Sequence, residues 1–204
     1  MNSSCSISAP KGRPREFDID DALAQALLVF WRNGYEAASM TELTTAMGIT
    51  KPSLYAAFGN KEQLFHKALD LYEREKLAYM RSALEAPTAR LVAERLLRGS
   101  LEMQMSTCDP KGCLGVISAA TCGAEAEPIK SEVVKRRASS EAALIKRFGE
   151  AQAAGELPEG MTPEALARFL FAILQGLALQ GGSGATCAQL SQLVETSMAV
   201  WPTK

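Results

Sequence analysis

Residues 34–64 read GYEAASMTELTTAMGITKPSLYAAFGNKEQL, and their helix caps and turn residues identify the first structural unit. Ser39 and the glutamate three residues later have the spacing of a capping box, which predicts a short helix that ends before Gly48. Pro52 suits the first turn of a second short helix, because amides in a first turn lack intrahelical partners. Two short helices joined by a tight turn indicate a helix-turn-helix, whose second helix fits the major groove of DNA.

The residues before this stretch predict a helix that supports it. Asp18 is a suitable N-cap, and apolar residues recur after it with helical spacing until Asn33-Gly34. We expect the apolar side chains of residues 39–58 to pack the two short helices together and against this first helix. Leu54 should therefore face inward.

The rest of the chain also has a helical pattern. A fourth, long helix is capped by Asn60 and is expected to run to about Pro87. No strand-like alternation of useful length and no internal repeat is found, so we predict an all-α fold. The predicted divisions are a flexible basic arm (1–15), a helix-turn-helix domain (16–62) and a second helical domain (63–204). Further helices are expected at residues 91–105, 113–121, 127–153, 162–182 and 186–201.

Composition narrows the class of protein. The chain has 204 residues, of which 47% are hydrophobic and 22% are charged. Its formal net charge is −1, so the overall charge does not indicate nucleic-acid binding. None of its five cysteines forms a C-x-x-C pair, which argues against a zinc site, and no metal or cofactor is expected. A single histidine, His66, and no paired carboxylate motif argue against an enzyme.

The same composition favours a cytoplasmic protein without a membrane partner. The N-terminus lacks the apolar core of a signal peptide. No apolar run approaches the ~20 residues of a membrane span. The strongest candidate, Phe169–Leu179, is short and contains Gln175 and Gly176. Scattered free thiols fit a reducing compartment.

Residues 34–64 resemble the TetR/AcrR family of repressors. The resemblance is carried by GY before the capping box, by the MG-I-K-S-LY-F run, and by K-E-L at the start of the next helix. It implies about nine helices, with a DNA-binding N-terminal part and a C-terminal part for ligand binding and dimerisation. It also implies a homodimer formed through the last two helices. The implied function is a repressor that an unidentified small-molecule effector releases from double-stranded operator DNA.

The resemblance also implies which residues meet the operator. Thr41 is expected to contact a phosphate at the start of the second helix. Tyr55 and Lys61 resemble the family's phosphate-contacting pair. Thr50, Lys51 and Ser53 are the expected readers of bases or phosphates.

The distribution of charge adds a second expected DNA contact. Residues 16–50 hold six acidic residues and one basic residue, whereas the preceding arm contains Lys11, Arg13 and Arg15. A basic arm beside a helix-turn-helix can reach the minor groove or the phosphates. The alternative is a solvated tail. Lys135-Arg136-Arg137 is a further basic run, but the glutamates around it favour a solvated helix face.

The C-terminal half offers candidate effector contacts and one candidate sensor thiol. Met103, Phe169 and Gln175 would suit an apolar cavity with one polar contact, although such residues also occur in an ordinary core. Cys113 follows Lys111 and Gly112, and a nearby cation or helix N-terminus favours a reactive thiolate. Burial would make the thiol inert instead. The alternatives are thus a thiol-based redox or electrophile sensor and an all-α ligand-binding or enzymatic protein that does not bind DNA.

Overall fold

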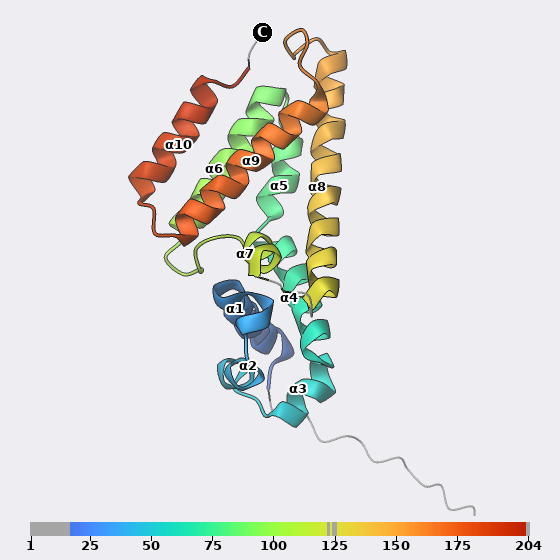
Figure 1. The fold of residues 1–204 in the computed structure, drawn as a ribbon, viewed down its shortest axis with the longest axis vertical. Helices are drawn as coiled ribbons and strands as arrows, with labels where there is room; N and C mark the ends of the chain where they lie inside the picture. Colours follow the sequence, from blue (N-terminus) through green and yellow to red (C-terminus); the bar gives the residue numbers. More distant parts are fainter. Residues whose placement is uncertain (1–16, 122, 124–125, 203–204) are drawn as a thin grey trace, which may run out of the picture.

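The computed structural model describes residues 17–121, 123 and 126–202. In these residues the chain forms ten α-helices and no β-strand. Figure 1 shows α1–α3 at one end of an elongated molecule, α8–α10 at the other end, and α4 leading from one to the other. The helices are α1 (Ile19–Ala37), α2 (Met40–Met47), α3 (Lys51–Phe58), α4 (Lys61–Glu75), α5 (Ala78–Leu84), α6 (Ala89–Met105), α7 (Leu114–Thr121), α8 (Glu127–Ala153), α9 (Pro163–Gly182) and α10 (Cys187–Ala199).

The short N-terminal helices begin at the caps that the sequence predicts. The Ser39 hydroxyl accepts a hydrogen bond from the Glu42 amide at 3.1 Å. The reciprocal half of the predicted capping box is absent, because the Glu42 carboxylate accepts from the Asn33 side chain at 2.7 Å instead. Gly48 ends α2 with φ +64°, a left-handed conformation that glycine adopts without steric cost. The turn between α2 and α3 is therefore fixed by local chemistry.

Two helix ends differ from the prediction by more than two residues. The backbone of Gly34 departs from helical geometry (φ +75°), but helix resumes and α1 extends to Ala37, so Gly34 is a kink and not an end. The predicted long fourth helix is wrong, because the chain breaks at Lys76–Leu77 into α4 and α5. The amides of Lys76 and Leu77 both donate to the Tyr72 carbonyl, at 2.8 and 3.2 Å, which tightens the end of α4.

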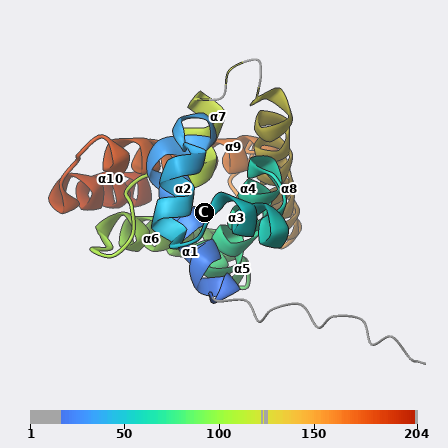
Figure 2. The same ribbon diagram turned by 90° about the horizontal axis from the view of Figure 1, so that it is seen from below.

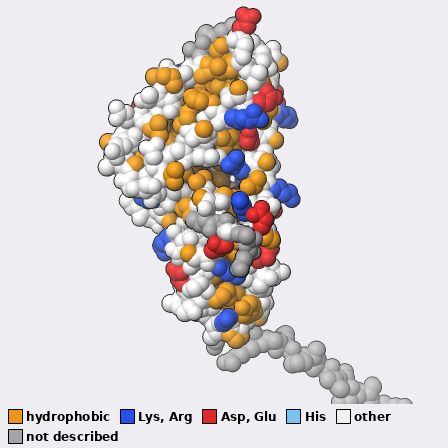
Figure 3. Space-filling view, viewed as in Figure 1, with side chains coloured by type: hydrophobic (Ala, Val, Ile, Leu, Met, Phe, Trp, Pro, Cys, Tyr) orange, Lys and Arg blue, Asp and Glu red, His pale blue; other side chains and the backbone are white. Residues whose placement is uncertain are grey.

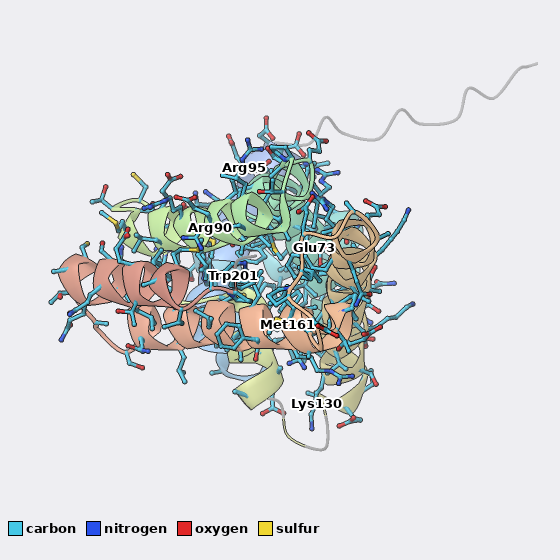
Figure 4. All side chains as sticks on the ribbon, turned by 90° about the horizontal axis from the view of Figure 1, so that it is seen from above. Glu73, Arg90, Arg95, Lys130, Met161 and Trp201 are labelled. Atoms are coloured by element: carbon cyan, nitrogen blue, oxygen red, sulfur yellow. The ribbon has the colours of Figure 1, made fainter. Side chains whose placement is uncertain are left out.

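Two separate apolar clusters hold the fold together. The lower cluster joins α1–α4 to α7 and the start of α8, with Trp31 fully buried in it. The upper cluster joins α5, α6, α9 and α10 to the second half of α8. Trp201 lies in the upper cluster, between α6 and α9 in Figure 4, with its ring centroid 6.1 Å from those of Phe148 and Phe169. The two clusters share no buried residue.

Helix α9 is long and apolar enough, by length and composition, to cross a membrane. The expectation that no apolar run approaches this length therefore does not hold. The core helix of a folded domain passes the same test, and α9 packs against α6, α8 and α10. Leu166, Leu170, Leu174 and Leu177 are buried along one side of it. These contacts are those of a core helix.

Candidate nucleic-acid interface

Helices α2 and α3 form the lower tip of the molecule, and Figure 2 shows them from that end. Leu43 of α2 and Leu54 and Phe58 of α3 are buried and attach both helices to α1 and α4. The prediction that Leu54 faces inward is confirmed, since its side chain is fully buried. Because the inner side of α3 is apolar, its opposite side faces solvent. The exposed positions of α3 are Lys51, Pro52, Tyr55 and Ala56.

Lys51 and Tyr55 are one helical turn apart on this exposed side. The Tyr55 side chain is 46% exposed, unusually high for a large aromatic residue. The Lys51 ammonium lies 6.0 Å from the centroid of the Tyr55 ring, at the limit of a cation–π contact. The pair presents a positive charge and a phenolic hydroxyl to solvent together. Both groups are suited to phosphate oxygens or base edges.

Thr50 and Ser53 stabilise the start of α3, and each has a hydroxyl group that can also bind DNA. Thr50 is the N-cap of α3, and its Oγ1 accepts from the Ser53 amide at 3.3 Å. The two hydroxyl oxygens are also 2.9 Å apart and hydrogen-bonded to each other. These contacts fix both side chains at the start of α3, where unpaired backbone amides favour an anion such as phosphate.

Thr41 and Lys61 flank this surface from neighbouring helices. Thr41 is exposed in the first turn of α2. The Lys61 ammonium donates to the Glu36 carbonyl at 3.2 Å and lies 4.6 Å above the Tyr35 ring. Lys61 therefore connects the start of α4 to the end of α1. Any phosphate contact by Lys61 would be added to these intramolecular ones.

The structure thus gathers Thr41, Thr50, Lys51, Ser53 and Tyr55 at one end of the molecule. Lys11, Arg13 and Arg15 lie outside the described residues. Sequence reasoning missed Pro52 and Ala56, which share the exposed side of α3 and could give the apolar contacts that thymine methyl groups accept. The signal that could have identified them is spacing, because Pro52 lies three residues before Tyr55 and four before Ala56.

A cavity of about 760 Å³ lies above this end of the molecule, between α4, α5, α6, α7, α8 and α9. Met103 and Gln175 line it, as does Cys113. Phe169 does not line it, because this side chain is 42% exposed on the far side of α9 and packs on Trp201. Sequence reasoning missed Tyr72, Tyr79 and Ser100, which also line the cavity but come from three helices that no sequence pattern connects.

An ion-pair cluster ties α8 to α4 beside the cavity. Arg136 of α8 donates to Asp70 at 2.7 Å and to Glu73 at 3.1 Å, both on α4, and to Glu132 of its own helix at 2.8 Å. The hydrogen bond from Arg136 lowers the pKa of Glu132. Figure 3 shows acidic and basic side chains along the edge formed by α8, while hydrophobic side chains gather above α9.

Comparisons with known proteins match both halves of the chain. The profile of the family described as bacterial regulatory proteins, tetR family, matches residues 22–68, and that of the tetracyclin repressor-like C-terminal domain matches residues 87–182. The HTH-type transcriptional repressor ComR of Escherichia coli (strain K12) is 32% identical over 198 residues, covering 96% of this chain and 94% of ComR. The HTH-type transcriptional repressor BdcR of the same strain is 46% identical over 61 residues, covering 30% of this chain and 31% of BdcR.

A solved structure extends the similarity to three dimensions. A cysteine mutant of the TetR family transcriptional regulator CifR, complexed with 26-bp double-strand operator DNA, has a TM-score of 0.88 and 40% sequence identity. The match covers 93% of this chain and 100% of that chain. At this identity and coverage, the likeness extends beyond the helix-turn-helix to the arrangement of the C-terminal helices.

Proposed function

The chain belongs to the TetR family of bacterial regulatory proteins, which are DNA-binding transcriptional regulators, and we propose that it represses transcription from a near-palindromic operator. A homodimer would place two α3 helices in successive major grooves, about one DNA turn apart. A small molecule in the cavity would favour a state with the wrong spacing of the two helices. The protein would act in the cytoplasm, where its operator is.

The observation that carries this proposal is the exposed side of α3. Lys51 and Tyr55 project from a helix whose opposite side is anchored by Leu54, and Thr50 and Ser53 are fixed at its start. A rigid helix with such a side is suited to the major groove, where donors and acceptors distinguish the base pairs. We propose that Lys51 and Tyr55 provide the strongest contacts and that Thr41 and Lys61 position the domain on phosphates.

The dimer would form through α9 and α10. Helix α9 has an apolar stripe on its solvent side. The stripe is formed by four residues, each three or four positions after the one before. Phe169 and Leu179 are 42% and 64% exposed, and Gly176 has open space beside its α-carbon. Large exposed apolar side chains of this kind mark interaction surfaces. The stripe consists of Phe169, Ala172, Gly176 and Leu179.

Selection of duplexes from a random-sequence DNA pool tests the proposal and supplies an operator probe. The purified full chain should enrich a near-palindromic sequence. Fluorescence anisotropy with that duplex should then show weaker binding for Lys51→Ala and for Tyr55→Ala, by about ten-fold each, with the protein still folded. Loss of one phosphate contact should also reduce the slope of log affinity against log salt by about one.

Lys135→Ala is the matched control, because Lys135 is an exposed lysine on α8, far along the chain from α3. Its operator affinity and salt slope should equal those of the unmodified protein. If no sequence is enriched, or if Lys135→Ala weakens binding as much as Lys51→Ala does, the assignment of the operator-binding surface to α3 is wrong.

A further inference from the structure

The cavity between α4 and α9 has a set of hydroxyl and thiol groups in its lining, apart from the charged residues. Its volume of about 760 Å³ is within the range of small-molecule sites, roughly 300–1,000 Å³. Most of its lining comes from aliphatic, aromatic and methionine side chains. The uncharged polar groups in the lining are the hydroxyls of Tyr72, Tyr79, Ser100 and Ser140, the Cys113 thiol and the Gln175 amide.

Tyr72, Tyr79, Ser100 and Cys113 line the cavity with hydroxyl and thiol groups, and together they are called the hydroxyl–thiol cluster. The Tyr72 hydroxyl donates to the Met103 sulfur at 3.8 Å, and Tyr72 lines the same cavity as Cys113. Tyr79 of α5 and Ser100 of α6 line it as well. Burial, followed by the neighbouring Cys113 thiol, raises the pKa of both tyrosines above the ordinary value. Both phenols therefore remain protonated and can donate a hydrogen bond.

A thioether sulfur is a weak acceptor for the proton of Tyr72. A carbonyl or ether oxygen from a ligand would be a better acceptor. A ligand that supplies such an oxygen would therefore gain a hydrogen bond at small cost to the protein.

The ionised groups around the cavity do not suit a charged ligand. Arg136 is engaged by three carboxylates, as described above. Arg74, Arg81 and Arg137 are exposed, so water already solvates their charges. The hydroxyl–thiol cluster itself contains no lysine, arginine, aspartate or glutamate. A charged ligand placed against it would lose hydration without gaining a counter-charge.

We propose that the cavity takes a neutral, mainly hydrocarbon molecule whose hydrogen-bond acceptor is held by the Tyr72–Tyr79–Ser100–Cys113 cluster. This inference rests on the proposed function, because the molecule would be the effector that releases the operator. It adds the chemical class of that molecule and the place where its binding reaches the DNA-binding helices.

The same wall of the cavity contacts α1 through Trp31. The Trp31 ring meets Tyr72 edge to face at 4.7 Å, and its Nε1 donates to the Gly112 carbonyl at 3.3 Å. Gly112 directly precedes Cys113. The Gln104 side chain of α6 accepts a hydrogen bond from the Gly112 amide at 2.7 Å and donates one to the Gly112 carbonyl at 3.1 Å. Trp31 is fully buried, so a shift of Tyr72 or of residues 112–113 must be accommodated by α1. A ligand at the cluster thus acts directly on a helix of the DNA-binding unit.

The test uses the full chain, two probes of similar length and the fluorescence of Trp31. The chain has two tryptophans, so Trp201→Phe leaves Trp31 as the only one. In this background, 2-nonanone, a neutral ketone, should shift the emission of Trp31 and lower operator affinity. Nonanoate, an anion with the same number of carbons, should require at least ten times the concentration for either effect.

Tyr72→Phe and Tyr79→Phe each remove one hydroxyl and keep the ring. Each variant should bind 2-nonanone about five-fold more weakly, as expected for one lost hydrogen bond, with unchanged circular dichroism. Tyr55→Phe on α3, outside the cavity, is the matched control for ketone binding alone and should bind the ketone normally in calorimetry. Calorimetry of the same titrations gives ketone affinity independently of Trp31 emission.

Three outcomes would overturn the inference while leaving operator binding intact. These are equal potency of nonanoate and the ketone, normal ketone binding by both tyrosine variants, and ketone binding in calorimetry that leaves Trp31 emission and operator affinity unchanged. Failure of the unmodified protein to select any operator would instead contradict the proposed function, and the Trp31 titration would still report on the ligand class.

Discussion

The DNA-binding tip and the ligand cavity are built in opposite ways. The tip is one continuous stretch, residues 39–61, in which Ser39, Thr50 and Asn60 each cap a helix through contacts within three residues. The cavity takes its walls from six helices spread over residues 69–178. A surface formed by consecutive residues is specified by local rules, whereas a cavity is specified by how distant helices pack. Substitutions at the tip should therefore leave ligand binding unchanged, and substitutions in the cavity should leave the structure of the tip unchanged. The exception is Trp31, which contacts both regions.

The largest expected effect is the loss of stability when the anchor of α3 is removed. Leu54→Ala deletes a fully buried side chain and should lower the free energy of unfolding by about 2–5 kcal/mol. Tyr55→Ala, at the next position, removes an exposed side chain and should change it by less than about 0.5 kcal/mol. Chemical denaturation followed by circular dichroism measures both. Equal effects at the two positions would mean that α3 is not anchored as described.

A slightly smaller effect is expected from disrupting the apolar stripe on α9. Leu179→Asp should produce monomers in light scattering and lower operator affinity about 100-fold, because two linked half-sites bind far more tightly than one. Leu91→Asp, at an exposed leucine on α6, is the control and should remain dimeric. A dimeric Leu179→Asp protein would place the dimer interface elsewhere and leave the outer side of α9 without a function.

Deletion of residues 1–15 should have a moderate effect. The segment lies outside the described residues, and its sequence has three basic residues and no acidic one. Truncation should weaken operator binding about three- to ten-fold and flatten the salt dependence, while the dimer and ketone binding remain unchanged. Replacing Lys11, Arg13 and Arg15 by glutamine in the full-length chain separates charge from length. Operator affinity equal to that of the intact chain would identify the arm as a passive tail.

The smallest effect is expected at the thiols. Of the three cysteines in the described residues, Cys108 and Cys187 are exposed and Cys113 is half-buried in the cavity wall, so a maleimide should label Cys113 more slowly than Cys108 and Cys187. Prior addition of 2-nonanone should slow labelling of Cys113 and leave the labelling rates of Cys108 and Cys187 unchanged. Cys113→Ser should still bind its operator. Rapid labelling of Cys113 alone, accompanied by release from DNA under a mild oxidant, would favour the thiol-sensing alternative.

The sequence predicts the tip well and the cavity poorly, for physical reasons visible in single residues. Thr50 and Gly48 predict the turn between α2 and α3, because helix capping and the left-handed backbone conformation both depend on residue type. The break at Lys76–Leu77 has no glycine or proline to mark it, and it depends on packing: α5 lies against α6, where Gly99 accommodates the Tyr79 ring. Helix α9 is apolar on both sides, so spacing alone could not show that Phe169 faces outward.

The two apolar clusters, each with its own tryptophan, have a consequence for how the chain unfolds. A protein with one continuous core tends to unfold cooperatively, whereas clusters that share no buried residue can open as separate units. Trp31 reports on the lower unit and Trp201 on the upper one. Coincident melting curves for the two fluorophores would mean that α4, α7 and α8 couple the units into one thermodynamic domain. Separate curves would give the free energy that couples the two units. That free energy is an upper limit on how much a change in one unit can stabilise or destabilise the other.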